Sequence, residues 1–242
     1  MPVGCTVHDD DRRLIAALSG DLGLGEVADL RVMLLKCLAE QPEALLIDLS
    51  RMTLSDPLAL AVFRAVRRQA ARWPGIPLLL CAPEPFTGTQ LRSATYRSLP
   101  VFATVDAARA QAQLERHTLP MLSDELLPIA GAARQARNVA TDACVRWGLP
   151  ELLAPASLIA SELVSNVVDH AHTMMTLRVT LRPRYLQIAV RDGAAGEPVP
   201  RTLAGAGTAR GRGLLLVKAT ANSWGWLPTQ DGKVVWASLR FA

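Results

Sequence analysis

The sequence is poor in cysteine and in aromatic residues, and it lacks long apolar runs. Its four cysteines are far apart and include no Cys-x-x-Cys pair, so neither a disulfide framework nor a zinc site is expected. No apolar run approaches the roughly 18 residues of a membrane span, and the N-terminus has no basic segment followed by an apolar one. Half of the 242 residues are hydrophobic, which is enough for a sizeable core. These features predict a folded cytoplasmic protein with no membrane partner.

Positive charge is present but is not concentrated in one block. The net charge is +4, and most of the basic residues are arginine. Residues 1–115 hold 12 basic and 13 acidic residues, whereas residues 116–242 hold 14 basic and 9 acidic ones. Because no Lys/Arg block with aromatic partners occurs, direct binding of nucleic acid is not expected. The positive second part suits an anionic ligand or an acidic partner, or it is an ordinary solvated surface.

The first part of the chain alternates strand and helix patterns. Short apolar runs predict strands at residues 12–22, 42–50 and 76–85. Helical spacing of apolar residues predicts helices at residues 25–41, 56–73 and 105–117. Asp56 and Pro57 are residue types that favour the N-cap and the first position of the second of these helices. This order predicts an α/β sheet with right-handed crossovers.

The second part combines helices with an antiparallel pattern of strands. Helices are predicted at residues 132–148, 154–171 and 214–224. Strands are predicted at residues 175–183, 184–193 and 233–241, and a short turn at Pro183 joins the first two into a hairpin. This composition predicts an α+β fold. Two prolines and mixed polarity in residues 118–131 indicate a junction, so we expect one domain at residues 1–117 and a second at residues 118–242.

The predicted helix at residues 154–171 carries a polar stripe. Glu162, Asn166 and His170 are spaced four apart and share one face, and no Lys or Arg occurs between Arg146 and Arg178. Carboxylate and amide oxygens are hard donors that can hold Mg²⁺ and its waters. A carboxylate near a bound phosphate can also act as a general base. For this helix alone, an ordinary solvated face is the alternative interpretation.

Two later segments add to this pattern. Asp192 ends an apolar strand, and an ionised carboxylate there can accept a hydrogen bond from the exocyclic amine of a base such as adenine. A plain hairpin turn, which Asp-Gly favours, is the alternative. The glycine-rich residues 203–213 precede a predicted helix, whose free N–H groups and dipole favour an anion. Together the three segments indicate a nucleotide site more strongly than any one of them.

The second part resembles the GHKL-type ATPase domain of bacterial anti-sigma factor serine/threonine kinases, which has the Bergerat fold. SELVSNVVDHA matches the N-box of that family, VRDGAAG its adenine-binding box and GRGLLLV its phosphate-lid box. The resemblance implies ATP and Mg²⁺ as cofactors, with Glu162 as the catalytic base and Asn166 as the Mg²⁺ ligand. The nucleotide-binding residues that it implies are Asn166, His170, Asp192, Gly196, Gly211, Arg212, Gly213 and Leu214. Ala194 departs from the family, which usually has glycine at that position, and it is expected to tighten the loop.

Residues 7–115 resemble a STAS domain, the fold of anti-sigma factor antagonists, in the region LLIDLSRMTLSDPLALAVF. Antagonists of that family carry a phosphorylatable serine two positions after an aspartate at a helix start. Alignment on Asp56 places Leu58 at this position, and leucine has no hydroxyl to accept a phosphate. Ser55 and Thr53 are nearby hydroxyls, but both precede the helix. The chain thus resembles an α/β STAS-like domain with a degenerate phosphosite, fused to an α+β GHKL ATPase-like domain.

This fusion predicts a regulator of bacterial transcription in a partner-switching system. In the first hypothesis, the second domain binds Mg-ATP, phosphorylates a serine on a separate STAS antagonist and binds a sigma factor. The tethered STAS-like domain then acts as a docking module or pseudosubstrate at a high local concentration. The resemblance also implies a homodimer through the C-terminal domain.

Two other hypotheses use the same motifs. The chain is alternatively a non-catalytic scaffold between STAS, kinase and sigma-factor partners, because loss of the phosphosite makes drift of the kinase site plausible. A sensor histidine kinase uses the same ATPase superfamily, but it needs a phosphoacceptor histidine on a dimerising pair of helices. His117 stands alone beside the junction, which disfavours that class.

Overall fold

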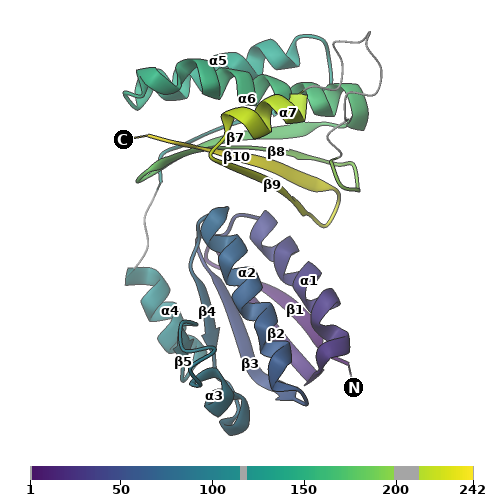
Figure 1. Ribbon diagram of the computed structural model, residues 1–242, viewed down its shortest axis with the longest axis vertical. Coiled ribbons are helices and arrows are strands. Elements are labelled where there is room, and N and C mark those ends of the chain that lie inside the picture. Colours follow the sequence, from purple (N-terminus) through teal and green to yellow (C-terminus); the bar gives the residue numbers. More distant parts are fainter. Residues whose placement is uncertain (1, 115–118, 199–212, 242) are drawn as a thin grey trace. The chain divides into compact units, whose positions relative to one another are not determined.

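The computed structural model describes residues 2–114, 119–198 and 213–241 (Figure 1). The chain forms two compact units, Met1–His117 and Thr118–Ala242. Each unit contains its own five-stranded sheet.

The N-terminal unit is an α/β sheet with the strand order β1-β2-β3-β4-β5. Its strands are β1 (Gly4–Asp10), β2 (Arg13–Leu22), β3 (Leu45–Leu54), β4 (Leu78–Cys81) and β5 (Val101–Phe102). Its helices are α1 (Val27–Ala39), α2 (Ala61–Arg72), α3 (Pro85–Leu91) and α4 (Val105–Leu114). β1 is antiparallel to β2, whereas β2 to β5 are parallel, which fits the continuous apolar run of β4.

The start of the second helical segment follows the predicted cap. The Asp56 carboxylate accepts a hydrogen bond from the Leu58 N–H (Oδ1–N, 2.8 Å), as expected of an N-cap. The first turn, Pro57–Leu60, is a 3₁₀ turn, and α2 continues from it. The sequence alone did not distinguish these two forms of helix.

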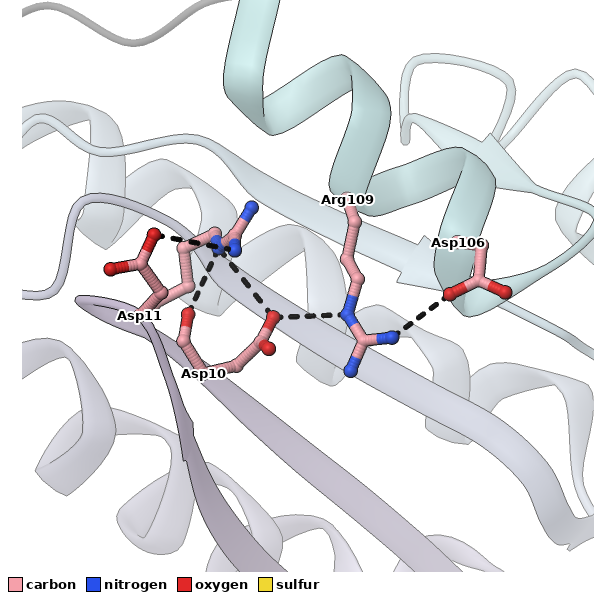
Figure 2. Close-up of polar contacts among 5 residues, drawn as sticks. Asp10, Asp11, Asp106 and Arg109 are labelled. Carbon is pink, nitrogen blue, oxygen red and sulfur yellow. Dashed lines mark hydrogen bonds and ion pairs between the residues drawn. The ribbon is translucent and has the colours of Figure 1, made fainter.

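A network of charged side chains fixes the last helix of the N-terminal unit. Figure 2 shows Arg109 of α4 donating to Asp10 (Nε–Oδ2, 3.0 Å) and to Asp106 (Nη1–Oδ1, 2.9 Å). Arg13 donates to the Asp10 carbonyl oxygen (Nε–O, 3.0 Å). The hydrogen bonds to Asp10 and Asp106 raise the pKa of the Arg109 guanidinium. The network therefore ties α4 to the turn between the first two strands.

The C-terminal unit is an antiparallel sheet with the strand order β6-β7-β8-β10-β9. Its strands are β6 (Met121–Leu126), β7 (Met175–Arg182), β8 (Tyr185–Asp192), β9 (Ser223–Pro228) and β10 (Lys233–Arg240). Its helices are α5 (Ala132–Arg146), α6 (Leu153–Asn166) and α7 (Gly213–Thr220), and they cover one face of the sheet (Figure 1). Their buried apolar side chains pack with the inward residues of β7, β8 and β10 to form the core.

Two expectations about this unit need correction, and one alternative interpretation is excluded. The segment at residues 118–131 contains strand β6, which pairs with β7. The helix expected at residues 214–224 ends at Thr220, and its last residues belong to β9. Asp192 does not begin a plain hairpin turn, because the strands that flank β8 are β7 and β10.

One continuous helical stretch, Pro150–Ala171, is long and apolar enough to pass a simple test for a membrane span. This differs from the expectation that no such run exists. The stretch includes α6, which contacts α5, α7, β8 and β10 and supplies much of the core. It therefore behaves as the central helix of a folded unit.

Candidate functional site

The polar stripe lies at the C-terminal end of α6. Glu162 and Asn166 are half-buried, and Asn166 is the last α-helical residue. The chain then makes a π-helical turn, Val167–Ala171, in which His170 is exposed. Such turns are frequent at functional sites. Leu163 and Val164 are buried in the core, as expected for the opposite side of the helix.

The Glu162 carboxylate lies against the start of α7. A Cβ atom added to Gly213 would be 2.6 Å from Glu162 Oε2, so only glycine leaves the carboxylate in place. Burial raises the pKa of the Glu162 carboxyl, and the positive charge of Arg137 on α5 opposes this shift. The helix that carries Glu162 has no cation in its sequence neighbourhood, yet the fold supplies one from α5. A carboxylate with a raised pKa is a better proton acceptor than an exposed one.

The segment after α6 leads directly to the Asp192 loop. His172 has a left-handed backbone (φ 54°), and its N–H donates to the Val167 carbonyl oxygen (2.9 Å). The next residue, Thr173, accepts a hydrogen bond from the Gly193 N–H (N–Oγ1, 3.0 Å). Met175 then pairs with Asp192 in the sheet. The fold thus brings the end of the polar helix next to the Asp192 loop.

Asp192 is a buried carboxylate with two different oxygen atoms. Its Oδ1 accepts hydrogen bonds from Lys233 Nζ (2.9 Å) and from the Ala194 N–H (2.8 Å). Its Oδ2 is also buried, yet it has no hydrogen-bond partner among the described residues. A buried acceptor without a partner is costly, and a ligand donor is one way to satisfy it. This oxygen fits the exocyclic amine of an adenine base.

The loop after Asp192 fits its sequence without strain at Ala194. Within this loop Gly196 has a positive φ (105°), whereas Ala194 does not. The Ala194 carbonyl oxygen accepts a hydrogen bond from Lys233 Nζ (2.9 Å). The alanine therefore takes part in the loop through its backbone, and the glycine is needed two residues later. Gly196 is exposed, and a Cβ atom at this position would meet no atom of the described residues within 4 Å.

The predicted phosphate-facing residues are only partly described. Gly211 and Arg212 lie outside the described residues. Gly213 is the first described residue of α7. The Leu214 side chain is packed in the core, so only its backbone is available for a phosphate.

The metal prediction depends on a nucleotide being bound. Among the described side chains, no group of three or more His, Cys, Asp or Glu residues is placed to hold a metal ion. Asn166 by itself offers one oxygen donor, its side-chain amide oxygen. Mg²⁺ is commonly held by one or two protein oxygens together with substrate phosphates, and the Asn166 position fits that arrangement.

Three residues near the site were not singled out from the sequence: Arg137, Gly232 and Lys233. A Cβ atom on Gly232 would collide with the backbone of Asp192 and Gly193, so this glycine allows a close approach. One feature of the sequence could have pointed to Lys233: it is a charged residue at the start of a mostly apolar predicted strand. Its partner Asp192 is 41 residues away, and only the pairing of β8 with β10 brings them together.

The degenerate phosphosite of the N-terminal unit is exposed. The Leu58 side chain is 68% exposed, directly after the N-cap Asp56. Ser55 and Thr53 are engaged elsewhere, since Ser55 Oγ donates to the Leu22 carbonyl oxygen (3.3 Å) and Thr53 Oγ1 to Asp21 Oδ1 (2.9 Å). The only side chain presented at the phosphosite position is therefore apolar.

Comparisons with known proteins place the C-terminal site in a family. Residues 129–239 match the model of the histidine kinase-like ATPase domain. No curated protein is significantly similar to this chain in sequence.

Solved structures similar to the chain include an anti-sigma factor antagonist from Mycobacterium paratuberculosis. It is 21% identical, covers 46% of this chain and 94% of its own, and has a TM-score of 0.42. The anti-sigma factor antagonist SpoIIAA in its unphosphorylated form is 14% identical, with 47% and 100% coverage and a TM-score of 0.39. A structure of the RsbU and RsbW domains of a Mycobacterium tuberculosis protein is 18% identical, with 50% and 32% coverage and a TM-score of 0.39.

The family match and the two sheets confirm the fold class that the sequence predicted. An α/β unit is followed by an antiparallel α+β unit. Residues 129–239 of that second unit, which contain Glu162, Asn166 and Asp192, are similar to the histidine kinase-like ATPase domain.

Proposed function

We propose that the chain is an ATP-dependent serine/threonine kinase in a bacterial partner-switching system, with a tethered STAS-like unit that cannot be phosphorylated. Its substrate is a serine on a separate STAS antagonist, and a sigma factor is the partner that it binds and releases. The observation that carries the proposal is the buried, unpartnered Asp192 Oδ2 within an ATPase-like domain. An acceptor in that position matches the amine of adenine.

The residues around Glu162 support a phosphoryl-transfer step. Glu162 takes the proton of the serine hydroxyl as that oxygen attacks the γ-phosphate, and ADP leaves. Its raised pKa and its position against Gly213 of α7 support this role, because the N-terminal end of a helix favours phosphate. Asn166, one turn further along α6, supplies an oxygen to Mg²⁺, which neutralises phosphate charge when bound.

The N-terminal unit supports the role of a docking module. Three large apolar side chains follow the carboxyl ends of the neighbouring parallel strands β2, β3 and β4, and they are exposed: Leu24 (57%), Leu58 (68%) and Phe86 (51%). Because the strands are parallel, these residues share one edge of the sheet. An exposed apolar group at the phosphosite position can occupy a kinase without accepting phosphate, as a pseudosubstrate does.

The test has two steps. Calorimetry with Mg-ATP on the full chain is expected to show binding, and Asn166→Ala is expected to weaken it strongly. Mass spectrometry then follows phosphate transfer to Leu58→Ser, which restores a hydroxyl at the phosphosite. We expect Leu58→Ser to gain one phosphate with Mg-ATP, and neither Leu58→Ala nor the double variant Leu58→Ser/Glu162→Gln to gain any.

The outcomes separate the kinase from the scaffold hypothesis. Absence of ATP binding by the full chain contradicts the nucleotide site. Binding without transfer, both to Leu58→Ser and to STAS antagonists that carry the serine, contradicts the kinase and leaves a nucleotide-binding scaffold.

A further inference from the structure

Lys233 is a buried lysine at the base of the adenine-box loop. It is 6% exposed and begins β10, where its inward position is shared by Val235, Ala237 and Leu239. It pairs across the sheet with Asp192 in β8. The sequence has 26 Lys and Arg residues, of which only three are lysine, so a buried lysine here is unusual in this chain.

The ammonium group of Lys233 makes the two oxygens of Asp192 different. Nζ donates to Asp192 Oδ1 (2.9 Å) and to the Ala194 carbonyl oxygen (2.9 Å). Oδ1 also accepts the Ala194 N–H (2.8 Å). These bonds occupy Oδ1 and leave Oδ2 as the acceptor without a partner among the described residues.

The turn between β9 and β10 holds Lys233 in place. Asp231 accepts hydrogen bonds from Arg191 (Oδ1–Nη2, 2.8 Å) and from the hydroxyl of Thr229 (Oδ1–Oγ1, 2.9 Å). Gly232 packs against the backbone of Asp192. The turn that precedes Lys233 is thus held against β8 at Asp231 and Gly232, which fixes the backbone from which the lysine side chain extends.

We propose that Lys233 is a positioning residue for base recognition: it fixes Asp192 as a charged acceptor with one free oxygen, so that the site selects a purine with an exocyclic amine over a 6-oxo purine. This inference rests on the proposed nucleotide site and adds to it a residue and a basis for specificity. A 6-oxo group presents lone pairs to the carboxylate oxygen, so neither partner can donate. A site built to accept a hydrogen bond rejects an analogue that lacks the donor.

Loss of the lysine charge is expected to weaken this selection. A buried carboxyl without a cation favours its neutral form, which carries an O–H donor and can bond to a 6-oxo group. The charged or titratable groups beside Asp192 in the chain and the sheet include Arg191 on β8, Lys233 on β10, Asp231 in the turn before β10 and His172 before β7. Asp231 and Arg191 pair with each other, and His172 is exposed, so Lys233 is the cation bound to Asp192 in the described part of the chain.

The experiment compares Mg-ATP with Mg-ITP, its 6-oxo analogue, by calorimetry on the full chain from about pH 6 to about pH 9, a range above the ordinary pKa of carboxyls. The variants are Lys233→Met, which removes the charge, and Lys233→Arg, which keeps it. Lys218→Met is the matched control, because Lys218 is exposed on α7. We expect the wild type, Lys233→Arg and Lys218→Met to prefer ATP by roughly 100-fold or more at every pH.

For Lys233→Met, the preference for ATP is expected to fall by about tenfold or more, because Asp192 is then no longer held as a charged acceptor with one free oxygen. If Lys233→Met does not fold, as judged by circular dichroism, Lys233→Gln replaces it, since glutamine keeps an N–H donor without the charge. An unchanged preference in the uncharged variant, at all pH values, overturns the role of Lys233 while the nucleotide site stands. A wild type that binds neither nucleotide overturns the site itself, and the inference with it.

Discussion

The contact between Glu162 and Gly213 allows a test that separates stability from catalysis. In Gly213→Ala the new methyl group would lie 2.6 Å from Glu162 Oε2, whereas Glu162 Cβ and Cδ would be at an ordinary 3.7 Å. Only the far end of a flexible side chain must move, at a cost of about 0.5–1.5 kcal/mol for an off-rotamer position. Replacing glycine by alanine within a helix gains roughly 0.5–1 kcal/mol. The cost of moving the Glu162 carboxylate and the gain from alanine in the helix therefore nearly cancel.

We therefore expect Gly213→Ala to change the free energy of unfolding by less than about 1 kcal/mol in urea titrations. Its phosphotransfer rate is expected to fall by about 10²–10⁴-fold, because the displaced carboxylate no longer takes the proton. Gly131→Ala is the matched control, since its methyl group would meet nothing within 4 Å and its backbone has φ −82°.

A double-mutant cycle shows whether the loss acts through the carboxylate. In a Glu162→Ala background, Gly213→Ala should cause no further loss of rate, because the group that it displaces is already absent. The reasoning is refuted if Gly213→Ala retains the wild-type rate, or if it lowers the rate of the Glu162→Ala variant as strongly as that of the wild type.

Three further predictions concern pH, backbone packing and the N-terminal unit. Burial raises the pKa of Glu162, so the folded chain binds the carboxyl proton more tightly than the unfolded chain does. Relative to Glu162→Gln, the free energy of unfolding of the wild type should therefore fall as the pH rises from about 4.3 through the raised pKa, which urea titrations at several pH values will show. The phosphotransfer rate should rise over the same interval, because Glu162 becomes ionised, and a pH–rate profile will show this. Gly232→Ala should destabilise the C-terminal unit by about 1–3 kcal/mol in urea titrations, because its methyl group meets the rigid backbone at Asp192; equal stability would contradict this packing. Arg109→Met should cost the N-terminal unit about 0.2–1 kcal/mol, as its ion pair with Asp10 is partly exposed, and raised salt should shrink the difference.

The sequence predicted the elements whose apolar residues have a clear period. The buried strands β3, β4, β8 and β10 and the helices α1, α2, α5 and α6 belong to this group. Two of the strands that it missed, β1 and β6, have mixed polarity, because they are partly exposed edge strands of their sheets and show no continuous apolar run. The missed strand β5 has only two residues, too few to show a period. The first residues of β9 were predicted as the end of a helix. What identifies them as a strand is the pairing with β10, which brings Gly225 close to Trp236, and that pairing is not visible in the local sequence.

The candidate site shows the same limit at the level of side chains. Spacing within one helix was enough to place Glu162 and Asn166 on a common stripe. The cation near Glu162 is Arg137 on another helix, and the partner of Asp192 comes from a strand 41 residues later. Contacts of this kind follow from strand order and helix packing, which a pattern along the chain does not contain.

The burial of Lys233 also gives the protein a chemical reporter. Amine-reactive reagents are expected to acylate Lys218 rapidly, since it is exposed, whereas Lys233 reacts only when the loop at Asp192 opens and its ammonium loses a proton. With only three lysines in the sequence, each modified peptide is easily assigned by mass. The acylation rate of Lys233 thus measures how often the base-binding loop opens in an otherwise folded molecule, and its slowing on addition of a nucleotide would register occupancy without any enzymatic assay.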